Sequence, residues 1–274
     1  MLTKIIDYKY SMSSISEILQ KIRSKSPLVH NITNYVVMNN TANALLAVGA
    51  SPVMAHAKEE VKDIVTISSS LVINMGTLSE KWVESMLMAT AQAKATNTPF
   101  VFDPVGVGAS AYRTEVAQKI IGTAIPNVIR GNASEIMALA KLTNSTKGVD
   151  STMDTQDAIE GATLLAKQLK NTVVISGAID YIITADTVNK IENGSPLMAK
   201  ITGMGCTATA MVGACLGVEE NTHVAAVTAM AIMGVAGDMA NDKSAGPGSF
   251  QMNFYDSLYE LSPEVLAVKV KTNA

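Results

Sequence analysis

The sequence predicts an α/β protein with one domain in three layers, in which a mostly parallel central sheet lies between two layers of helices. Short apolar runs alternate along the chain with longer segments of helical periodicity, which is the pattern of parallel strands joined by crossover helices. These runs lack alternating polar residues, as expected of strands buried on both faces. No linker rich in Pro, Gly or Ser divides the 274 residues, so we expect residues 1–274 to form a single domain.

The first half of the chain supplies two strands and two helices. Asn40–Ala50 has apolar residues at helical spacing and ends around Gly49, a residue that favours helix C-termini. Leu71–Met75 (LVINM) is a short apolar run between turn residues and predicts a buried strand. Ser79–Thr96 opens with a residue that favours N-caps and predicts a helix. Pro99–Asp103 (PFVFD) predicts the next strand, which ends in the turn PVGVGAS.

The second half continues the alternation. Two further strands are expected at Asn127–Arg130 and Thr172–Ser176, and Asp180–Ile191 is expected to be a strand or a hairpin. The expected helices are Arg113–Ala124, Ser134–Leu142, Thr155–Leu169 and Thr222–Asn241.

Composition excludes several kinds of partner. Hydrophobic residues make up 48% of the chain and charged residues 16%, so much of the chain can be buried. The net charge is −3 and Lys and Arg are not clustered, which excludes nucleic acid as an expected partner. Aromatic residues, at 4%, are too few to predict a platform for stacking bases.

The sequence also predicts a cytoplasmic protein with no membrane partner. Charged residues at Lys4, Asp7 and Lys9 interrupt any signal-peptide core. The apolar runs 201–218 and 224–237 are shorter than the roughly 20 residues that a membrane span requires, and both predict buried core.

The two cysteines, Cys206 and Cys215, are not expected to form a disulfide. They are nine residues apart, and a helix from about Thr207 places the second more than two turns inside it, too far for a bridge. The chain has no CxxC pair and no Cys/His cluster, so no zinc site is predicted.

Ligands of such folds bind beyond the carboxyl ends of the strands, and one expected strand end leads into the glycine-rich ITGMGC. Gly203 and Gly205 precede a helix start, where unpaired backbone N–H groups and the helix dipole favour an anion. The alternative is that these glycines only allow a helix and a strand to pack closely.

Two acidic residues follow neighbouring expected strands. Asp103 and Glu135 together can hold Mg²⁺ through water, since this ion prefers few carboxylates and completes its shell with substrate phosphates. The alternatives are a turn cap ahead of proline for Asp103 and an acidic residue in the first turn of a helix for Glu135.

Cys206 has three possible roles. The helix N-terminus predicts a lowered thiol pKa, which suits a covalent nucleophile, although no histidine adjoins it in sequence as a base. The thiol can instead position a hydroxyl group or accept its proton during attack on phosphorus, where little base strength is needed. The third possibility is a small buried residue, which is our interpretation of Cys215.

Six stretches in order resemble the hydroxyethylthiazole kinases, the ribokinase-like salvage kinases of thiamine biosynthesis. GMGC resembles the ribokinase-like GAGD motif with Cys in place of Asp, and GNASEI carries the N-x-x-E pattern used near Mg²⁺ and phosphates. The matching stretches are His30–Ala57, Leu71–Leu78 (LVINMGTL), Phe102–Ser110 (FDPVGVGAS), Ile129–Ile136 (IRGNASEI), Ile201–Cys206 (ITGMGC) and Ala245–Phe250 (AGPGSF).

The resemblance implies a role for each matching position. Cys206 is the expected catalytic residue, and the anion hole consists of Gly203, Gly205 and Cys206. Arg130 and Ser176 match positions that contact ATP. The expected substrate contacts are Met54, Gly203 and Asn34, and the expected metal ligands are Asp103 and Glu135. Met204 departs from the family, which usually has a small residue in the anion hole.

The implied activity is transfer of the γ-phosphoryl group of ATP, with Mg²⁺, to the primary hydroxyl of 4-methyl-5-(2-hydroxyethyl)thiazole. The resemblance also implies a homotrimer with active sites between subunits. Two alternatives are a ribokinase-like kinase for another small alcohol, such as hydroxymethylpyrimidine, and a non-catalytic thiazole-binding or thiol-sensing protein.

Overall fold

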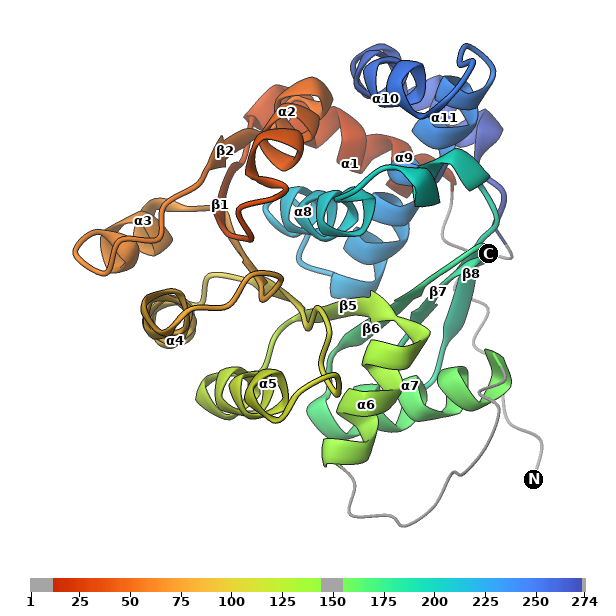
Figure 1. Cartoon of the computed structure of the whole chain (residues 1–274). Coiled ribbons are helices and arrows are strands. Elements are labelled where there is room, and N and C mark those ends of the chain that lie inside the picture. Colours follow the sequence, from red (N-terminus) through yellow and green to blue (C-terminus); the bar gives the residue numbers. More distant parts are fainter. Residues whose placement is uncertain (1–11, 144–154, 273–274) are drawn as a thin grey trace.

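One eight-stranded sheet runs through the computed structural model, which describes residues 12–143 and 155–272 (Figure 1). The strand order is β2-β1-β3-β4-β5-β6-β7-β8. Neighbouring pairs among the first six strands are parallel, whereas β6–β7 and β7–β8 are antiparallel. The strands are β1 Leu28–Ile32, β2 Ser51–Val53, β3 Ser70–Asn74, β4 Phe100–Asp103, β5 Val128–Asn132, β6 Thr172–Ser176, β7 Asp180–Ile183 and β8 Val188–Ile191.

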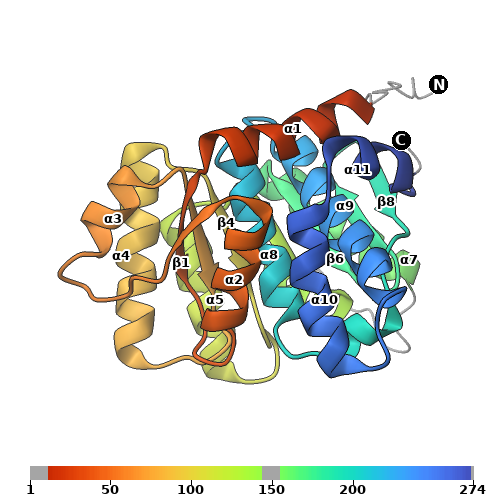
Figure 2. The same cartoon turned by 90° about the horizontal axis from the view of Figure 1, so that it is seen from above.

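Helices cover both faces of the sheet, which confirms the predicted three-layer α/β class (Figures 1 and 2). Because successive strand residues point to opposite faces, Val72 enters one core while Leu71 and Ile73 enter the other. One face carries α1 Met12–Lys25, α2 Met38–Val48, α8 Met204–Leu216, α9 Thr222–Asn241, α10 Pro247–Glu260 and α11 Pro263–Lys269. The other carries α3 Val61–Ile67, α4 Glu80–Thr96, α5 Ala111–Thr123, α6 Ala133–Thr143 and α7 Thr155–Leu169.

The chain changes direction across the sheet between β1 and β3. It first passes from β1 through α2 to β2 at the edge, and then returns through α3 to β3 on the other side of β1. From β3 it continues through β4, β5 and β6. Since crossovers between parallel strands are right-handed, the helices change faces when the direction changes. The carboxyl ends of β1 and β3 therefore flank a topological switch point, where ligands of open α/β sheets bind.

The predicted elements agree closely with the structure. Thr155–Leu169, Thr172–Ser176 and Thr222–Asn241 have the predicted bounds, and Asp180–Ile191 is a hairpin of β7 and β8. The Ser79 side chain caps α4 by accepting from Trp82 N. Helix α8 begins at Met204, earlier than expected, with Gly203 at its N-cap at a φ of +88°. The strand expected to lead into ITGMGC is wrong, because Pro196–Lys200 forms a 3₁₀ helix that leads into this turn. Sequence patterns did not predict α1, β1, β2, α3, α10, α11 or the 3₁₀ helix η1 Pro196–Lys200.

Helix α9 has the length and apolar character of a membrane span, with a mean hydropathy of 1.4 in its most apolar window. In the structure, 89% of that window is buried. The helix packs against α8, α10 and the sheet, as predicted for core.

Helix α8 lies directly against the sheet at Gly213. A Cβ atom there would lie 2.6 Å from Cγ2 of Val72 and 3.2 Å from Cγ1 of Val29. The Gly213 carbonyl also accepts a 2.7 Å hydrogen bond from the Ser70 hydroxyl. The missing side chain thus sets the depth at which α8 packs against β1 and β3.

We expect Gly213→Ala to lower the free energy of unfolding by about 1–3 kcal/mol, because the added methyl group overpacks a buried interface. Urea denaturation followed by circular dichroism measures this change. Gly122→Ala is the control, since a Cβ at Gly122 in α5 meets nothing within 4 Å. That variant is expected to be neutral or up to about 1 kcal/mol more stable. Equal stabilities of the two variants would contradict the packing argument.

Candidate active site

The carboxylate of Asp103 lies at the carboxyl end of β4 and is 1% exposed. Its Oδ2 accepts 2.7 Å hydrogen bonds from Asn74 Nδ2 on β3 and Thr209 Oγ1 on α8. Burial raises the pKa of Asp103 to about 6, although the Arg130 charge and the hydrogen bonds from Thr209 and Asn74 oppose the rise. No described residue donates to Oδ1, which is buried. One carboxylate oxygen is thus anchored and the other is available to a ligand.

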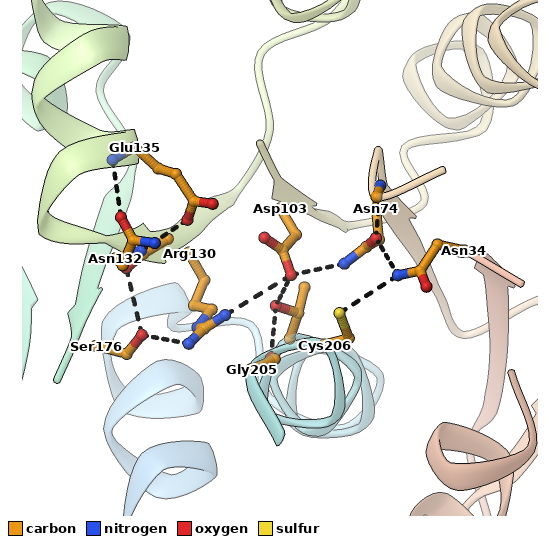
Figure 3. Close-up of polar contacts among 12 residues, drawn as sticks. Asn34, Asn74, Asp103, Arg130, Asn132, Glu135, Ser176, Gly205 and Cys206 are labelled. Atoms are coloured by element: carbon orange, nitrogen blue, oxygen red, sulfur yellow. Dashed lines mark hydrogen bonds and ion pairs between the residues drawn. The ribbon is translucent and has the colours of Figure 1, made fainter. Parts of the chain in front are cut away.

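A chain of amides leads from Asp103 to the thiol (Figure 3). Asn74 Oδ1 accepts a 2.9 Å hydrogen bond from Asn34 Nδ2, and the same nitrogen lies 3.4 Å from Cys206 Sγ and donates to it. Asn34 follows β1 and Asn74 ends β3, so the switch point brings these two side chains together. Three of the expected site residues, Asn34, Asp103 and Cys206, therefore belong to one network.

Cys206 is in the first turn of α8 and is partly exposed. Burial, followed by the Asp103 charge, raises the pKa of its thiol, while the amides of Asn74 and Asn34 and the Arg130 charge act in the opposite direction. The lowered pKa predicted from the helix N-terminus is therefore wrong. The reason is that the sequence alone does not show the burial or the neighbouring carboxylate. Cys215 is completely buried in the core, as predicted.

The expected anion hole lies at the start of α8. Thr207 N donates to Gly203 O at 2.8 Å and closes the first turn, so the N–H groups of Gly205 and Cys206 precede the intrahelical bonds. A Cβ at Gly203 would lie 2.7 Å from Val37 Cγ1. Its positive φ is also unfavourable for other residues. This geometry is compatible with both interpretations of the glycines, the anion site and the close packing of the helix. The close packing creates the turn in which the N–H groups are left without intrahelical partners.

Arg130 on β5 connects this turn to the next strand. Its Nη1 lies 3.7 Å from Asp103 Oδ2, and its Nη2 donates to the hydroxyl of Ser176 at the end of β6. A Cβ at Gly205 would lie 2.7 Å from Arg130 Nη1, so a side chain there would require the guanidinium to move from its place beside the helix start. The two expected ATP contacts, Arg130 and Ser176, are adjacent to the expected anion hole (Figure 3).

Glu135 is part of a capping box at the start of α6. Asn132 Oδ1 accepts from Glu135 N at 2.9 Å, and Glu135 Oε2 accepts from Asn132 N at 2.9 Å. Glu135 Oε1 accepts from Gly106 N at 2.8 Å and so fixes the turn after β4. Glu135 therefore does have its alternative role, that of an acidic residue in the first turn of a helix. The capped carboxylate nevertheless lies near enough to Asp103 for its charge to raise the pKa of that residue.

The remaining expected residue, Met54, follows the edge strand β2 at the same end of the sheet and is half-buried. Strand β1 separates β2 from β3. The structure thus places Met54 one strand away from the switch point.

Sequence reasoning missed three residues that organise the site. Asn74 and Thr209 hold Asp103, and Arg113 donates to the carbonyl oxygens of Met75, Gly76 and Val105 at 2.6–2.7 Å. Asn74 could have been found, because it ends an apolar strand next to the strand that Asp103 ends. Thr209 and Arg113 gave no local signal, since each is an ordinary residue within a helix.

The three-layer fold, with a glycine-rich helix start facing a buried strand-end acid, is the fold of ribokinase-like proteins. A ribokinase-like protein from Enterococcus faecalis V583 shares this fold, with a TM-score of 0.64, 13% identity and coverage of 90% of this chain and 95% of that chain. The pattern of the hydroxyethylthiazole kinase family matches residues 19–264. The chain belongs to the hydroxyethylthiazole kinase family.

Individual relatives agree with this membership. Hydroxyethylthiazole kinase of Leptospira biflexa serovar Patoc is 51% identical over 266 residues, which is 97% of this chain and 99% of that protein. The corresponding protein of Desulfotalea psychrophila is 51% identical over 93% of this chain and 95% of its own length. The solved hydroxyethylthiazole kinase protein of Pyrococcus horikoshii OT3 has a TM-score of 0.88 and 38% identity, and the match covers 95% of this chain and 98% of that one.

The buried Asp103 predicts a pH-dependent contribution to stability. Its pKa in the fold, about 6, is above the ordinary value of 3.8, so the folded state holds the proton more tightly than the unfolded state. The stabilisation is complete below the unfolded pKa and is lost as pH rises through the folded pKa. Relative to Asp103→Asn, we expect the wild-type free energy of unfolding to fall by up to about 3 kcal/mol between about pH 4 and pH 7.

Urea denaturation of both proteins at several pH values measures this difference. The pKa of Asp180 is also raised to about 6, mainly by burial, but Asp180 is present in both proteins and its contribution cancels. A stability difference that increased with pH would show that the carboxylate is favoured as an anion in the fold.

Proposed function

We propose that the protein transfers the γ-phosphoryl group of ATP to the primary hydroxyl of 4-methyl-5-(2-hydroxyethyl)thiazole. The observation that carries this proposal is the position of Cys206. The thiol lies at a helix start that can bind an anion and is connected through two amides to Asp103. Membership of the family supports the choice of substrate, and a Staphylococcus aureus pyridoxal kinase of the same fold, 17% identical with a TM-score of 0.61, has been solved in complex with ADP.

In this proposal, the N–H groups at the start of α8 stabilise the charge of the transferring phosphoryl group. Arg130 and Ser176 bind the phosphates or ribose of ATP from the neighbouring strand ends. Met54, Gly203 and Asn34 contact the thiazole alcohol. Cys206 holds the hydroxyl in line for attack. Only its thiolate form can accept the hydroxyl proton, and it does so late, because a loose transition state requires little base strength.

The residues present fit Mg²⁺. Asp103 Oδ1 is buried without a partner among the described residues, and each oxygen of Glu135 accepts one backbone N–H group and has capacity for a further partner. Among the described residues, no three of the His, Cys, Asp and Glu side chains converge as a cage, which suits an ion that keeps its waters and substrate phosphates. When bound, Mg²⁺ would neutralise phosphate charge. Asp103 and Glu135 would hold it directly or through water.

The assay that tests the proposal compares ADP release with the thiazole alcohol, with hydroxymethylpyrimidine and without an acceptor. We expect turnover with the thiazole alcohol well above the other two. Preference for the pyrimidine would favour the kinase of another small alcohol. No turnover with any acceptor, together with thiazole binding, would favour the non-catalytic alternative.

A homotrimer stays a prediction from the family resemblance, and a cytoplasmic location stays a prediction from the sequence. In the described surface, Tyr35, Val36, Leu46 and Ile67 are large apolar side chains that are 60–68% exposed near the β1 and β2 edge of the sheet. Their exposure is compatible with a subunit interface, and light scattering tests the trimer directly.

We expect Glu135→Gln to lower turnover far more than stability. The amide keeps one oxygen acceptor for the capping box but turns its NH2 group toward Gly106 N, so the loss of stability should be about 1–3 kcal/mol. The loss of charge should raise the Mg²⁺ concentration required for half-maximal turnover. Titration of activity with Mg²⁺, alongside urea denaturation, measures both effects. Normal turnover at limiting Mg²⁺ would leave Glu135 with the structural role alone.

We expect Cys206→Asp to keep or raise activity, because Asp is ionised at pH 7 and the helix N-terminus favours negative charge. Cys206→Ala should lower turnover by about 10²–10⁴-fold and leave residual activity, since the anion hole remains. Steady-state kinetics on folded, ATP-binding variants measure both. An inactive Cys206→Asp, or a covalent adduct on Cys206 found by mass spectrometry during turnover, would contradict the role assigned to this thiol.

A further inference from the structure

We propose that Asn74 is a positioning residue that fixes the direction of the hydrogen bonds between Asp103 and Cys206, so that the sulfur is always the acceptor from Asn34. The effect of Asn74 on turnover rests on the proposed function, whereas the direction of the hydrogen bonds does not. Asn74 contacts Asp103, Asn34 and Gly76 and lies at the end of β3, 1% exposed.

The direction follows from a backbone group. Gly76 N lies 3.0 Å from the Asn74 side chain, and a backbone N–H can only donate. The Asn74 atom facing it must therefore be Oδ1, and Nδ2 must face Asp103, where it donates to Oδ2 at 2.7 Å. A reversed Asn74 amide would place its oxygen against the Asp103 carboxylate, and it would place its NH2 group against the N–H of Gly76, so that two donors faced each other.

The same reasoning fixes Asn34. Because Asn74 Oδ1 is an acceptor, the Asn34 atom 2.9 Å away must be Nδ2. That nitrogen has two hydrogens, one for Asn74 and one for Cys206 Sγ at 3.4 Å. The sulfur therefore accepts from Asn34, and the neighbouring amide of Asn74 also favours its thiolate form. Among the described residues, no group donates to the remaining side-chain atom, Asn34 Oδ1, which is an acceptor suited to an alcohol O–H.

Tight packing prevents Asn34 from leaving this arrangement. A Cβ at Gly76 would lie 2.5 Å from Asn34 Nδ2 and 2.8 Å from Asn34 Cβ. The Asn34 side chain thus lies directly against the Gly76 backbone, whose carbonyl is held by Arg113 at 2.6 Å. Gly76→Ala displaces Asn34 without changing any polar group in the chain from Asp103 to Cys206.

Two variants test the proposal, with one control. Asn74→Leu removes both the donor and the acceptor at similar volume, and Gly76→Ala displaces Asn34 and covers the case in which Asn74→Leu fails to fold. Asn171→Leu is the matched control. Asn171 is also a buried asparagine with one backbone partner, Pro126 O at 3.1 Å, but it precedes β6 at the opposite end of the sheet.

The first measurement separates kcat from KM. We expect kcat to fall about 10- to 100-fold in Asn74→Leu and in Gly76→Ala, because a small misplacement of reacting groups has effects of this size. The KM for ATP should stay within about threefold, since Arg130 and Ser176 are untouched. Asn171→Leu should lose stability without losing kcat. A loss of kcat in the control equal to that in Asn74→Leu would reduce Asn74 to a structural residue.

The second measurement needs no substrate and so remains decisive if the proposed function fails. It is the rate of Cys206 alkylation by iodoacetamide at a fixed pH, with Cys206→Ser as the background for the fully buried Cys215. Loss of the Asn34 donor disfavours the thiolate, so we expect alkylation at least about threefold slower in Asn74→Leu and Gly76→Ala than in wild type and Asn171→Leu. An unchanged or faster rate in the folded variants would overturn the proposal, even if kcat had fallen.

Discussion

One buried oxygen atom, Asp103 Oδ2, joins the elements that make up the site. It receives a strand-end amide from β3 and a hydroxyl from α8, and it pairs with a guanidinium from β5. A buried carboxylate is unfavourable unless such partners surround it, so the fold must hold these elements in fixed relative positions. The close packing of α8 at Gly213 does so by bringing Thr209 to the sheet. The positions of Cys206 and the glycine turn follow from the same packing.

The elements that could be predicted are those whose signal is local. Thr172–Ser176 has a continuous apolar centre (VVI) between two hydroxyl residues, and Thr222–Asn241 is a long uninterrupted helical pattern, so both were predicted with the correct bounds. Strand β1 (LVHNI) was missed because His30 and Asn31 are polar but completely buried. His30 is accommodated by the carbonyl of Ala55, 25 residues away, at 2.7 Å. Polar residues whose partners are distant in sequence cannot be recognised as buried from the sequence.

The same distinction applies to the site. Strand-end position and motif order indicated Asp103, Glu135, Arg130 and Cys206, and the structure brings them together at the carboxyl ends of the central strands (Figure 3). The contacts among them could not be predicted, because Cys206 meets Asn34 across 172 positions and Thr209 meets Asp103 across 106. The predicted lowering of the Cys206 pKa was wrong because it did not include these long-range contacts. The helix start is visible in the sequence, but the burial and the neighbouring carboxylate that outweigh it arise only from long-range packing.

The late position of α8 in the chain has a consequence for synthesis. Asp103 leaves the ribosome 106 residues before Thr209, an interval of roughly 5–20 s at elongation rates of about 5–20 residues per second. During this interval the nascent sheet can pair β1 to β4, but its central carboxylate lacks the hydroxyl and the helix that later cover it. Until then, the apolar face of this partial sheet is exposed to proteases and chaperones. When α8 is synthesised, it covers β1, β3 and β4 and also brings Thr209 to Asp103.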